Sequence, residues 1–369
     1  MFSEEHLYSI ALRRSVLIGD ISFQKLVREF GSAKKAWETP KKHLTKITGI
    51  GSRIVEDIGN SEHLKFAEKE LRFCEKENIR ILLRHLKELP ELLSECIDAP
   101  SVLYQKGNFD RQRKTVSIVG TRNVTSYGKT FTEQLVEMLK DKNCTTVSGL
   151  ALGTDTEVHA QSLEKNIPTI AVLAHGFHTM YPSKNRMLAE KIIEENGALL
   201  TEFNSSQKPD RENFIQRNRI VAGMSEATII VETAFGGGSV STAGFANGYN
   251  RDVYALPGKI TDKYSQGCNH LIYQNKAGAI SALKDLLNEL GFSENSLKME
   301  ELFPRSETII QLTEIQQLIY DFVKNHPNIS LDEISENMEI PSFKILPEIL
   351  ELELSGRIKT LSGQRFTVI

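Results

Sequence analysis

The stretch that decides the fold is Ser117-Ile118-Val119-Gly120-Thr121-Arg122. Its β-branched residues predict a strand over Val116–Gly120, and Tyr127-Gly128-Lys129 opens a helix just beyond it. A glycine at the end of a strand lets backbone N–H groups turn towards an anion, and the following helix adds the positive end of its dipole. Gly120, Thr121 and Arg122 therefore predict a phosphate site, although a tight turn with a surface arginine would give the same pattern.

Short β-branched runs and helical stretches alternate from residue 115 to residue 290. After the first strand, five more are expected at Thr145–Gly149, Pro168–Ala174, Ala198–Phe203, Ala227–Glu232 and Val253–Pro257. Helical periodicity marks Phe131–Lys140, Thr156–Lys165 and Asn185–Asn196. This alternation predicts an α/β domain with a mostly parallel sheet and helices on both faces, whose ligand binds at the carboxyl ends of the strands.

The flanking segments predict further domains. Residues 1–114 are expected to form a helical domain without such strands. Residues 291–308 lose periodicity and gain Ser, Glu and Pro, which is typical of a linker. Residues 309–369 predict a short hairpin around Gly356 and Gly363, preceded by three helices at Glu314–Asn325, Leu331–Asn337 and Phe343–Leu354.

The composition excludes several classes of protein. The chain of 369 residues is 40% hydrophobic and 25% charged, as in ordinary soluble proteins. Glu4 and Glu5 stand where a secretory signal would carry lysines, and no apolar run could span a membrane, so we expect a cytoplasmic protein without membrane contact. The four cysteines are far apart and include no Cys-x-x-Cys pair, which argues against a metal site and against disulfides.

Charge is distributed unevenly along the chain. Lys and Arg against Asp and Glu number 21 to 17 in residues 1–114, 17 to 18 in 115–290 and 7 to 13 in 291–369. A protein that coats duplex DNA usually carries a positive field over its whole surface. Any nucleic-acid contact is therefore expected in a local groove.

The second strand of the predicted sheet also ends in candidate site residues. Ser148 and Gly149 allow close approach of a ligand, and the serine hydroxyl could donate to it. Asp155 and His159 lie four residues apart on the next helix, where they could bond each other or contact the ligand. Because no serine or cysteine nucleophile is matched to His159, it gives little support for catalysis.

Two later segments bring cations and an aromatic ring. Lys184 and Asn185 begin one helix, while Phe214, Arg217, Asn218 and Arg219 lie within two turns of another. An aromatic ring beside paired arginines suits a stacked base flanked by phosphates. A salt-bridged arginine and a core phenylalanine would also fit this pattern.

A glycine-rich turn follows the fifth strand. Gly237, Gly238 and Ser239 precede a helix and predict an anion-binding nest. The same arrangement of strand, glycine turn and helix therefore recurs at three loops of one sheet edge, so the three loops reinforce one another.

The segment from about 115 to 285 resembles the DNA-processing A family, also called DprA or Smf. Ordered motifs carry the resemblance: Ile118-Val119-Gly120-Thr121-Arg122, Ser148-Gly149-Leu150-Ala151 with Gly153, Asp155 and His159, Tyr181-Pro182 with Asn185, Arg217-Asn218-Arg219-Ile220, Gly238-Ser239 with Thr242-Ala243, Leu256-Pro257-Gly258, and Gly267-Cys268-Asn269 with Leu271-Ile272. Carried over by motif, the family's pocket would include Gly120, Arg122, Ser148, Gly149, Lys184, Asn185, Phe214, Arg217 and Arg219.

The resemblance implies an extended Rossmann-like domain that dimerises and binds single-stranded DNA. It further implies protection of that strand, assistance in loading the RecA recombinase during natural transformation, and no metal, cofactor or catalytic activity. The chain departs from the family pattern at Leu152, where a basic residue is common, and at Ile215 and Gln216, where proline and a cation are common. Both departures remove potential positive charge and so bear on DNA affinity.

The N-terminal domain resembles a SAM-like helical domain with a helix-hairpin-helix over Leu44–Val55. In such a motif the glycines present N–H groups to a phosphate and nearby cations add attraction. A second DNA contact would then involve Gly49, Gly51, Lys46 and Arg53. A packing role alone is the alternative.

Residues 309–369 resemble a winged helix, whose third helix normally enters a major groove. Here that helix carries Glu348, Glu351 and Glu353 beside Lys344. Phosphates would repel these carboxylates, so we expect a protein-interaction or structural role for this domain.

Two enzymatic functions compete with DNA binding. A nucleoside-monophosphate phosphoribohydrolase has a Gly-Gly-x-Gly-Thr loop similar to Gly236-Gly237-Gly238-Ser239, but its catalytic glutamate is missing, since the next carboxylate is Asp252. A nicotinamide-dependent dehydrogenase would need more glycines after Gly120. We therefore predict a non-enzymatic protein, with a phosphoribohydrolase-like enzyme as the alternative.

Overall fold

The computed structural model describes residues 2–15, 17–292, 312–326, 329–361 and 365–368. The chain divides into two compact units, Met1–Ser293 and Glu294–Ile369. Residues 293–308 of the expected linker lie outside the described residues. Its first two residues belong to the first unit, because Phe292 is buried with Leu287 and Leu290.

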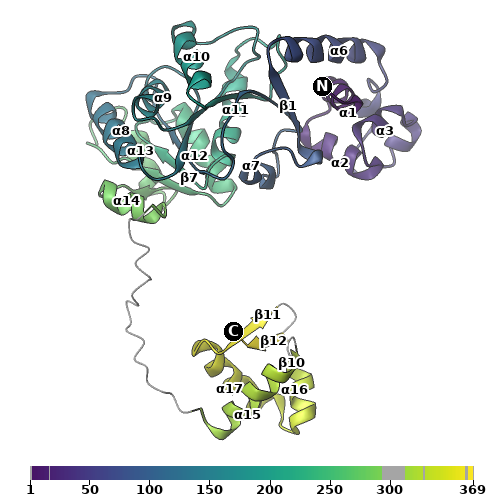
Figure 1. Ribbon diagram of the computed structural model, residues 1–369, viewed down its shortest axis with the longest axis vertical. Coiled ribbons are helices and arrows are strands. Elements are labelled where there is room, and N and C mark those ends of the chain that lie inside the picture. The colour runs from purple at the N-terminus through teal and green to yellow at the C-terminus, as the bar shows by residue number, and fades with distance from the viewer. Residues whose placement is uncertain (1, 16, 293–311, 327–328, 362–364, 369) are drawn as a thin grey trace. The chain divides into compact units, whose positions relative to one another are not determined.

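A nine-stranded sheet forms the centre of the first unit (Figure 1). Its strands are β1 (Ile79–Leu83), β2 (Val102–Gly107), β3 (Lys114–Val119), β4 (Cys144–Ser148), β5 (Thr169–Val172), β6 (Ala198–Thr201), β7 (Ala227–Ile230), β8 (Asp252–Ala255) and β9 (Gly278–Ala279). The order across the sheet is β1-β2-β6-β5-β4-β3-β7-β8-β9. All pairs are parallel except β1 with β2 and β2 with β6.

The strand order reverses at β3. The chain passes from β3 through β4 and β5 to β6 on one side, then returns to place β7 on the other side of β3. Val116 of β3 accordingly pairs with Thr146 of β4 and with Ala227 of β7. The carboxyl ends of these three strands therefore lie side by side at a topological switch point, which is where ligands bind in sheets of this kind.

The prediction of an α/β fold with a mostly parallel sheet is confirmed, and all six predicted strands exist. The four central ones from β3 to β6, like β7, are buried along nearly their whole length. Burial on both faces produces the uninterrupted runs of β-branched and small residues from which they were predicted.

The prediction that residues 1–114 contain no strands is wrong. β1 and β2 pair antiparallel with each other, and β2 pairs antiparallel with β6, so the sheet extends into this segment. Polar residues interrupt both strands: Arg80 is exposed in β1, and Gln105 and Lys106 lie in β2. Neither strand therefore shows the apolar run of a central strand. The domain boundary at residue 114 stays a prediction, although the sheet crosses it.

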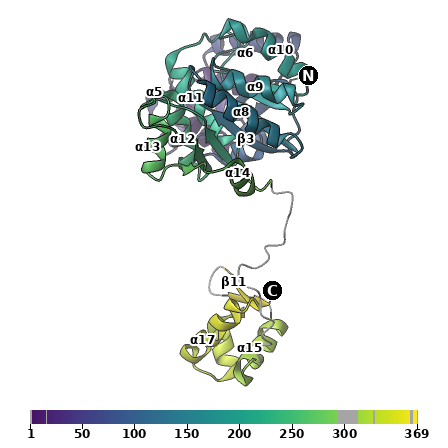
Figure 2. The ribbon, with the colours of Figure 1, turned by 90° about the vertical axis from the view of Figure 1, so that its left-hand side faces the viewer.

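Helices cover both faces of the sheet. They are α7 (Glu91–Glu95), α8 (Ser126–Leu139), α9 (Thr154–Glu164), α10 (Arg186–Glu194), α11 (Arg211–Gly223), α12 (Gly238–Gly248), α13 (Gln266–Tyr273) and α14 (Leu283–Glu289). Figure 2 shows α8 and α9 together on the near face, with α11, α12 and α13 on the other side. The predicted helices correspond to α8, α9 and α10, which confirms them.

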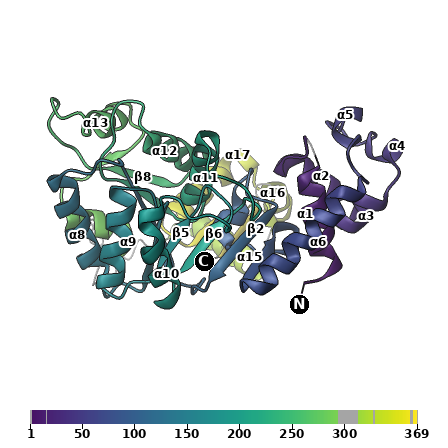
Figure 3. The same ribbon diagram turned by 90° about the horizontal axis from the view of Figure 1, so that it is seen from above.

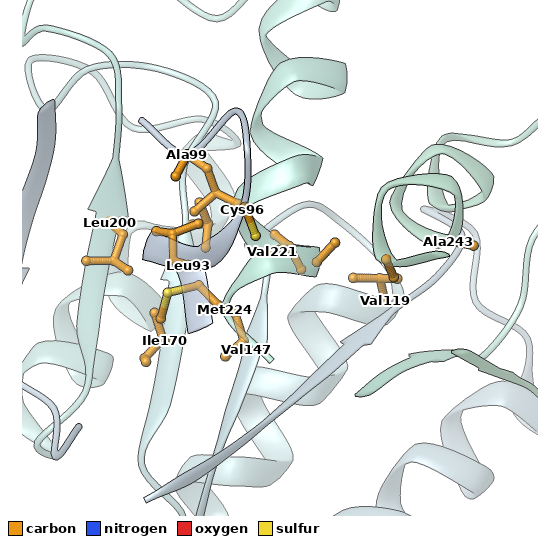
Figure 4. Packing of buried hydrophobic residues seen from close by; sticks show 14 of the residues in the cluster. Leu93, Cys96, Ala99, Val119, Val147, Ile170, Leu200, Val221, Met224 and Ala243 are labelled. Atoms are coloured by element: carbon orange, nitrogen blue, oxygen red, sulfur yellow. The ribbon is translucent and has the colours of Figure 1, made fainter. Parts of the chain in front are cut away.

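Alternate residues of the strands pack into separate cores on the two faces. Val116 and Ile118 of β3 are buried with α8 and α9, whereas Val119 belongs to the cluster under α11 and α12. Figure 4 shows this second cluster, where Val119 and Val147 from the sheet lie near Val221 and Met224. Apolar burial of this extent is the main stabilising contribution in such a fold.

Six helices precede the sheet and pack around a core of their own. They are α1 (Glu4–Arg14), α2 (Asp20–Phe30), α3 (Ala33–Glu38), α4 (Lys41–Leu44), α5 (Ser52–Val55) and α6 (Ser61–Lys76). Phe23, Leu26 and Trp37 are buried in this core. Figure 3 shows these helices beside the β2 end of the sheet.

A buried carboxylate fastens α6 to the sheet. Glu70 accepts hydrogen bonds from the backbone N–H and the hydroxyl of Ser205, both at 2.6 Å. Ser205 lies beyond the carboxyl end of β6, so this contact joins the N-terminal helices to the edge of the sheet where the candidate site lies.

The described part of the second unit contains three helices and a small antiparallel sheet. Its elements are α15 (Glu314–Asn325), β10 (Ile329–Ser330), α16 (Leu331–Met338), α17 (Ser342–Leu354), β11 (Ile358–Leu361) and β12 (Arg365–Val368), with strand order β10-β12-β11. The three predicted helices and the hairpin are confirmed, while Gly363 lies outside the described residues. The winged-helix assignment stays a prediction.

The exposed side of α17 is apolar and acidic. Phe343, Leu346 and Leu350 recur at helical spacing and are 72%, 53% and 55% exposed, and Glu351 is exposed beside them. This surface does not suit a groove lined by phosphates.

The four cysteines are buried free thiols. Burial raises the pKa of each of them, to about 11 for Cys96 and Cys144 and about 12 for Cys268. Within the described ranges, no helix combines the length and the apolar character needed to cross a membrane.

Candidate nucleic-acid interface

A pocket of about 790 Å³ lies at the carboxyl ends of β3, β4 and β7. The loops after these three strands line it together with α11 and the start of α12. The sheet therefore places the candidate site at its switch point, as the parallel topology predicts.

The loop after β3 turns tightly over the start of α9. Thr154 donates its backbone N–H and its hydroxyl to the carbonyl oxygen of Thr121, at 3.0 and 3.2 Å. A Cβ at Gly120 would lie 2.5 Å from the hydroxyl oxygen of Thr154, so only glycine fits there. The turn leaves Arg122 exposed at the pocket, without an ion pair to any described residue.

The loop after β4 is built around the guanidinium group of Arg217. This side chain comes from α11, is 4% exposed, and donates hydrogen bonds to the carbonyl oxygens of Gly149 and Val172. A Cβ at Gly149 would lie 2.1 Å from Nη1 of Arg217, which explains the glycine. Burial raises the pKa of Asp155, and the nearby charge of Arg217 opposes that rise. Arg217 thus joins two strand ends and places a positive charge beneath the pocket.

The ring of Phe214 lies among cations on the pocket wall. The guanidinium carbon of Arg122 lies 5.0 Å from the ring centroid, and that of Arg217 lies 5.9 Å from it. Tyr181 meets the ring edge-on, with centroids 5.8 Å apart and planes at 68°. Contacts of this kind hold an aromatic ring in place. Because Phe214 is only partly buried, part of its ring stays accessible to a ligand.

The amino end of α12 forms another wall. Gly237 caps the helix, and its first turn contains no acidic residue. Asn218 of α11 holds this turn, because its Nδ2 donates to the carbonyl oxygen of Gly238 at 3.2 Å and to Oγ of Ser241 at 2.9 Å. Ser239 is 6% exposed, and its Oγ has no hydrogen-bond partner among the described residues. Free backbone N–H groups and the helix dipole favour an anion at this position.

Charge in the pocket is positive at the solvent side. Arg122, Arg211 and Arg217 line it, as do two carboxylates, Asp155 and Asp210. Asp155 is buried next to Arg217, and Asp210 caps α11 by accepting a hydrogen bond from the Glu212 N–H at 3.0 Å. The exposed guanidinium groups of Arg122 and Arg211 are therefore available for phosphate groups. No cluster of three metal-ligating side chains occurs in the part of the chain that the structure describes.

A sequence model of the DNA recombination-mediator protein A family matches residues 80–291. The chain belongs to this family. The resemblance to DprA and Smf proteins is thereby confirmed, and the match begins at β1, before the predicted boundary at residue 114.

Two kinds of relative agree with this family assignment. Protein Smf of Synechocystis is 34% identical over 300 residues, which cover 79% of this chain and 74% of the relative. The X-ray structure of DNA processing protein A from Streptococcus pneumoniae has a TM-score of 0.65 and 27% identity, over 80% of this chain and 99% of that one. A Helicobacter pylori DNA processing protein A structure, described by its single-stranded DNA binding mode, has a TM-score of 0.52 and 28% identity over 57% and 95% of the two chains.

In this member of the family, the structure brings most of the predicted site residues into one pocket. Its lining includes Gly120, Thr121, Arg122, Gly149, Asp155, Phe214, Arg217, Asn218, Gly237, Gly238 and Ser239. It does not include Ser148, His159, Lys184, Asn185 and Arg219.

Two of the residues outside the lining, Ser148 and Asn185, support the loops around the pocket. Ser148 is buried and donates its hydroxyl to the carbonyl oxygen of Ile118 at 2.7 Å. Nδ2 of Asn185 donates to the Leu150 carbonyl oxygen at 2.9 Å and to Oγ1 of Thr156 at 2.8 Å. The predicted hydrogen bond between Asp155 and His159 does not form, because His159 bonds Thr169 instead, so this prediction is wrong.

His159 bonds elsewhere because of its burial. Its Nδ1 lies 2.7 Å from Oγ1 of Thr169, and its Nε2 has no partner among the described residues. Burial lowers the pKa of this imidazole to about 3, with the charge of Arg217 as a smaller cause, so the ring is neutral at physiological pH.

Arg219 points away from the pocket. It is 6% exposed and forms ion pairs with Glu202 and with Asp20 of α2, the latter at 3.3 Å. Asp20 also pairs with Arg13 at 3.1 Å. This buried network joins α11 to the N-terminal helices. Lys184, by contrast, is exposed outside the lining.

Among the lining residues that were not predicted, Tyr181 and Arg211 offer an aromatic ring and a cation for a nucleotide. Tyr181 is 47% exposed and contacts Phe214, and Arg211 is exposed in the first turn of α11. An aromatic residue before Pro182 and a cation directly after the helix cap Asp210 were the available sequence signals.

The departures from the family pattern have defined positions. Ile215 lines the pocket and is 48% exposed, and Leu152 is 41% exposed outside the lining. Gln216 donates to Glu202 at 2.9 Å. Of the three, Ile215 is thus the one that lines the pocket itself.

Proposed function

We propose that this protein binds single-stranded DNA in the pocket at the carboxyl ends of β3, β4 and β7, and that it acts in DNA recombination without catalysing a reaction. The observation that carries the proposal is the accessible ring of Phe214, which lies beside the exposed guanidinium group of Arg122 and in the same pocket as Arg211 and the free amino end of α12. Membership of the recombination-mediator family and the printed binding mode of the Helicobacter pylori relative support it.

The pocket offers one group for each part of a nucleotide. A base can stack on Phe214 or Tyr181, since every base has an apolar face. Arg122 and Arg211 can each contact a phosphate, and the N–H groups at the start of α12 with Ser239 can hold another. Because these contacts read neither base edges nor a groove, binding is expected to be independent of sequence.

Binding to labelled oligonucleotides at two salt concentrations tests the proposal. Single-stranded DNA should bind more tightly than duplex of the same length. Arg122→Gln should weaken binding to every sequence alike and reduce the slope of log affinity against log salt by about 0.7, the value for one phosphate on a single strand. Lys140→Gln, which removes an exposed cation at the C-cap of α8, is the matched control.

Equal affinity of wild type, Arg122→Gln and Lys140→Gln, or binding that does not depend on salt, would refute a phosphate clamp at Arg122. Unaltered far-ultraviolet circular dichroism should accompany the weaker binding, because Arg122 is exposed and makes no ion pair to a described residue.

A phosphoribohydrolase would need a free carboxylate in the pocket to act on the ribose. Of the two carboxylates that line it, Asp155 is buried beside Arg217 and Asp210 caps α11. We therefore expect no release of free base when the protein is incubated with AMP or other nucleoside monophosphates. Clear turnover in that assay, lost in an Asp155→Asn variant, would establish the enzyme instead.

The family resemblance also motivates proposals about partners. We infer that the protein protects the bound strand, assists the loading of the RecA recombinase, and forms a homodimer through its Rossmann-like domain. Tyr273 of α13 and Ile260, which are 84% and 83% exposed on that domain, are the side chains we propose for the dimer contact. Sedimentation equilibrium of the full chain, and of Tyr273→Asp, tests the dimer; a monomeric wild type rejects it.

A further inference from the structure

A second cationic surface lies on the N-terminal helices, away from the pocket. Two hollows, of about 430 and 830 Å³, flank the turn between α4 and α5. Three cations and one carboxylate line each hollow. We call the six cations the hairpin surface: Lys41, Lys42 and Arg53 in the first hollow, and Lys25, Arg28 and Lys46 in the second.

The charges of the hairpin surface are not neutralised within the fold. All six side chains are exposed, and none forms an ion pair with a residue in the described ranges. The carboxylates of the hollows are Glu29 and Glu56 alone. Like charges gathered around one turn repel each other and raise the free energy of the folded chain. A polyanion bound there would relieve that repulsion.

The turn itself is ordered by the same side chains. Gly49 adopts a φ of +83°, and a Cβ there would lie 2.8 Å from Nζ of Lys25. That nitrogen donates to the carbonyl oxygen of Thr48 at 3.1 Å, and Lys41 donates to the carbonyl oxygen of Glu56. Two of the six cations are therefore held in place at the turn, while four extend freely into solvent.

The hairpin surface and the pocket are on the same side of the first unit. Figure 2 shows α5 at the edge where α11, α12 and α13 lie, and Figure 3 shows α4 and α5 at the same edge as α12 and α13. A strand that leaves the pocket can therefore reach the hairpin surface without passing around the sheet.

We propose that the hairpin surface binds the phosphate backbone of the same single strand whose bases occupy the pocket. This inference rests on the proposed function and extends the site from one pocket to a path along the molecule. Lysine and arginine side chains that contact phosphates fix the position of a strand but do not read its bases. The hairpin surface thus adds affinity for long strands only.

Oligonucleotides of two lengths distinguish DNA binding at the hairpin surface from DNA binding in the pocket. One labelled oligonucleotide has about 8 nucleotides, enough for a single site of this kind, and the other is several times longer. The test variant is Lys42→Gln/Lys46→Gln/Arg53→Gln. The control is Lys140→Gln/Lys191→Gln/Lys284→Gln, which removes the same charge from exposed positions at the C-cap of α8 and on α10 and α14.

The test variant should bind the short strand as wild type does and the long strand more weakly, with a salt slope reduced by about 2 for three lost phosphate contacts. The control variant should bind both strands like wild type. Arg122→Gln should weaken both.

Three results would overturn the inference. If the test variant binds the long strand like the control while Arg122→Gln is weakened, the hairpin surface is not part of the path and the proposed function stands. Weakened binding of a long duplex, with the long single strand unaffected, would assign the surface to duplex DNA. Failure of wild type to bind either strand would remove the proposed function as well.

Discussion

Arg217 illustrates how one buried side chain supports a binding site without leaving the core. Its guanidinium group joins the ends of β4 and β5 through the carbonyl oxygens of Gly149 and Val172, and its charge compensates that of Asp155. Part of the positive potential of the pocket therefore comes from a residue that also stabilises the fold.

Arg217→Gln should lower the free energy of unfolding by about 3 kcal/mol, because it leaves carbonyl oxygens unpaired and Asp155 without its compensating charge. Urea unfolding followed by far-ultraviolet circular dichroism measures this free energy of unfolding. Arg211→Gln, an exposed neighbour on the same helix, should unfold like wild type. Equal stability of Arg217→Gln and wild type would show that the buried network is not needed.

Phe214 should contribute to DNA binding by stacking of its aromatic ring on a base rather than by apolar contact alone. Phe214→Leu removes the stacking surface while keeping an apolar side chain, and should cost about 1–3 kcal/mol of binding free energy, the range for one stacked base. Phe214→Trp should retain most of the affinity. Fluorescence anisotropy with a short single-stranded oligonucleotide makes the comparison, and equal affinities for the leucine and tryptophan variants would exclude stacking at this position.

At the residue scale, sequence patterns identified the loops but not the direction in which each side chain points. Arg122 was found because a strand-end glycine exposes the residue after it. Arg219 was placed in the pocket with Arg217, although its ion-pair partner Asp20 lies 199 residues earlier in the chain. Local residue spacing cannot predict an ion pair between residues so far apart in the chain. The burial of Arg219 could therefore be found only from the structure.

At the element scale, the strands that could be predicted were those buried on both faces. β3 to β7 run through the middle of the sheet and consist of apolar runs, whereas polar residues interrupt the edge strand β1 and its neighbour β2. Edge strands of this kind resemble loops or amphipathic helix in a short window. The N-terminal helices were correctly expected, but their attachment to the sheet through β2 was not.

The contact between α6 and the sheet edge should make stability depend on pH. Burial raises the pKa of Glu70 above its ordinary value, with smaller opposing contributions from its bonds to Ser205. Folding therefore favours the protonated carboxyl, and this contribution to stability is lost as pH rises from the unfolded pKa through the folded one.

Glu70→Gln removes this titration and keeps a side chain that can bond Ser205. The difference in unfolding free energy, variant minus wild type, should increase as pH rises from about 4 to 7. Glu68→Gln, which changes an exposed carboxylate on the same helix, should show no such increase. A difference between Glu70→Gln and wild type that is constant over this range would contradict the buried titration.

At the scale of the whole molecule, both proposed DNA-binding surfaces lie in one of the two units. The pocket and the hairpin surface belong to Met1–Ser293, and the second unit has its own core around Ile319, Ile345 and Leu352. The acidic and apolar surface of α17 is unsuited to phosphates, so the second unit is not expected to contact the DNA.

A chain truncated after Ser293 should bind single-stranded DNA with the affinity and salt slope of the full chain. Each unit has a separate core, so the truncated chain should also retain its thermal unfolding midpoint. Anisotropy titrations and calorimetry provide the two readouts. A tenfold loss of affinity in a truncated chain that is fully folded would assign DNA contact to the second unit.

The central claim is that the strand occupies the loops at the switch point of the sheet. Hydrogen–deuterium exchange with and without a saturating single-stranded oligonucleotide locates it directly. Exchange should slow in residues 120–123 and 236–241, and should not change in residues 108–113, which line a separate hollow. Slower exchange elsewhere, with both pocket loops unchanged, would contradict the account.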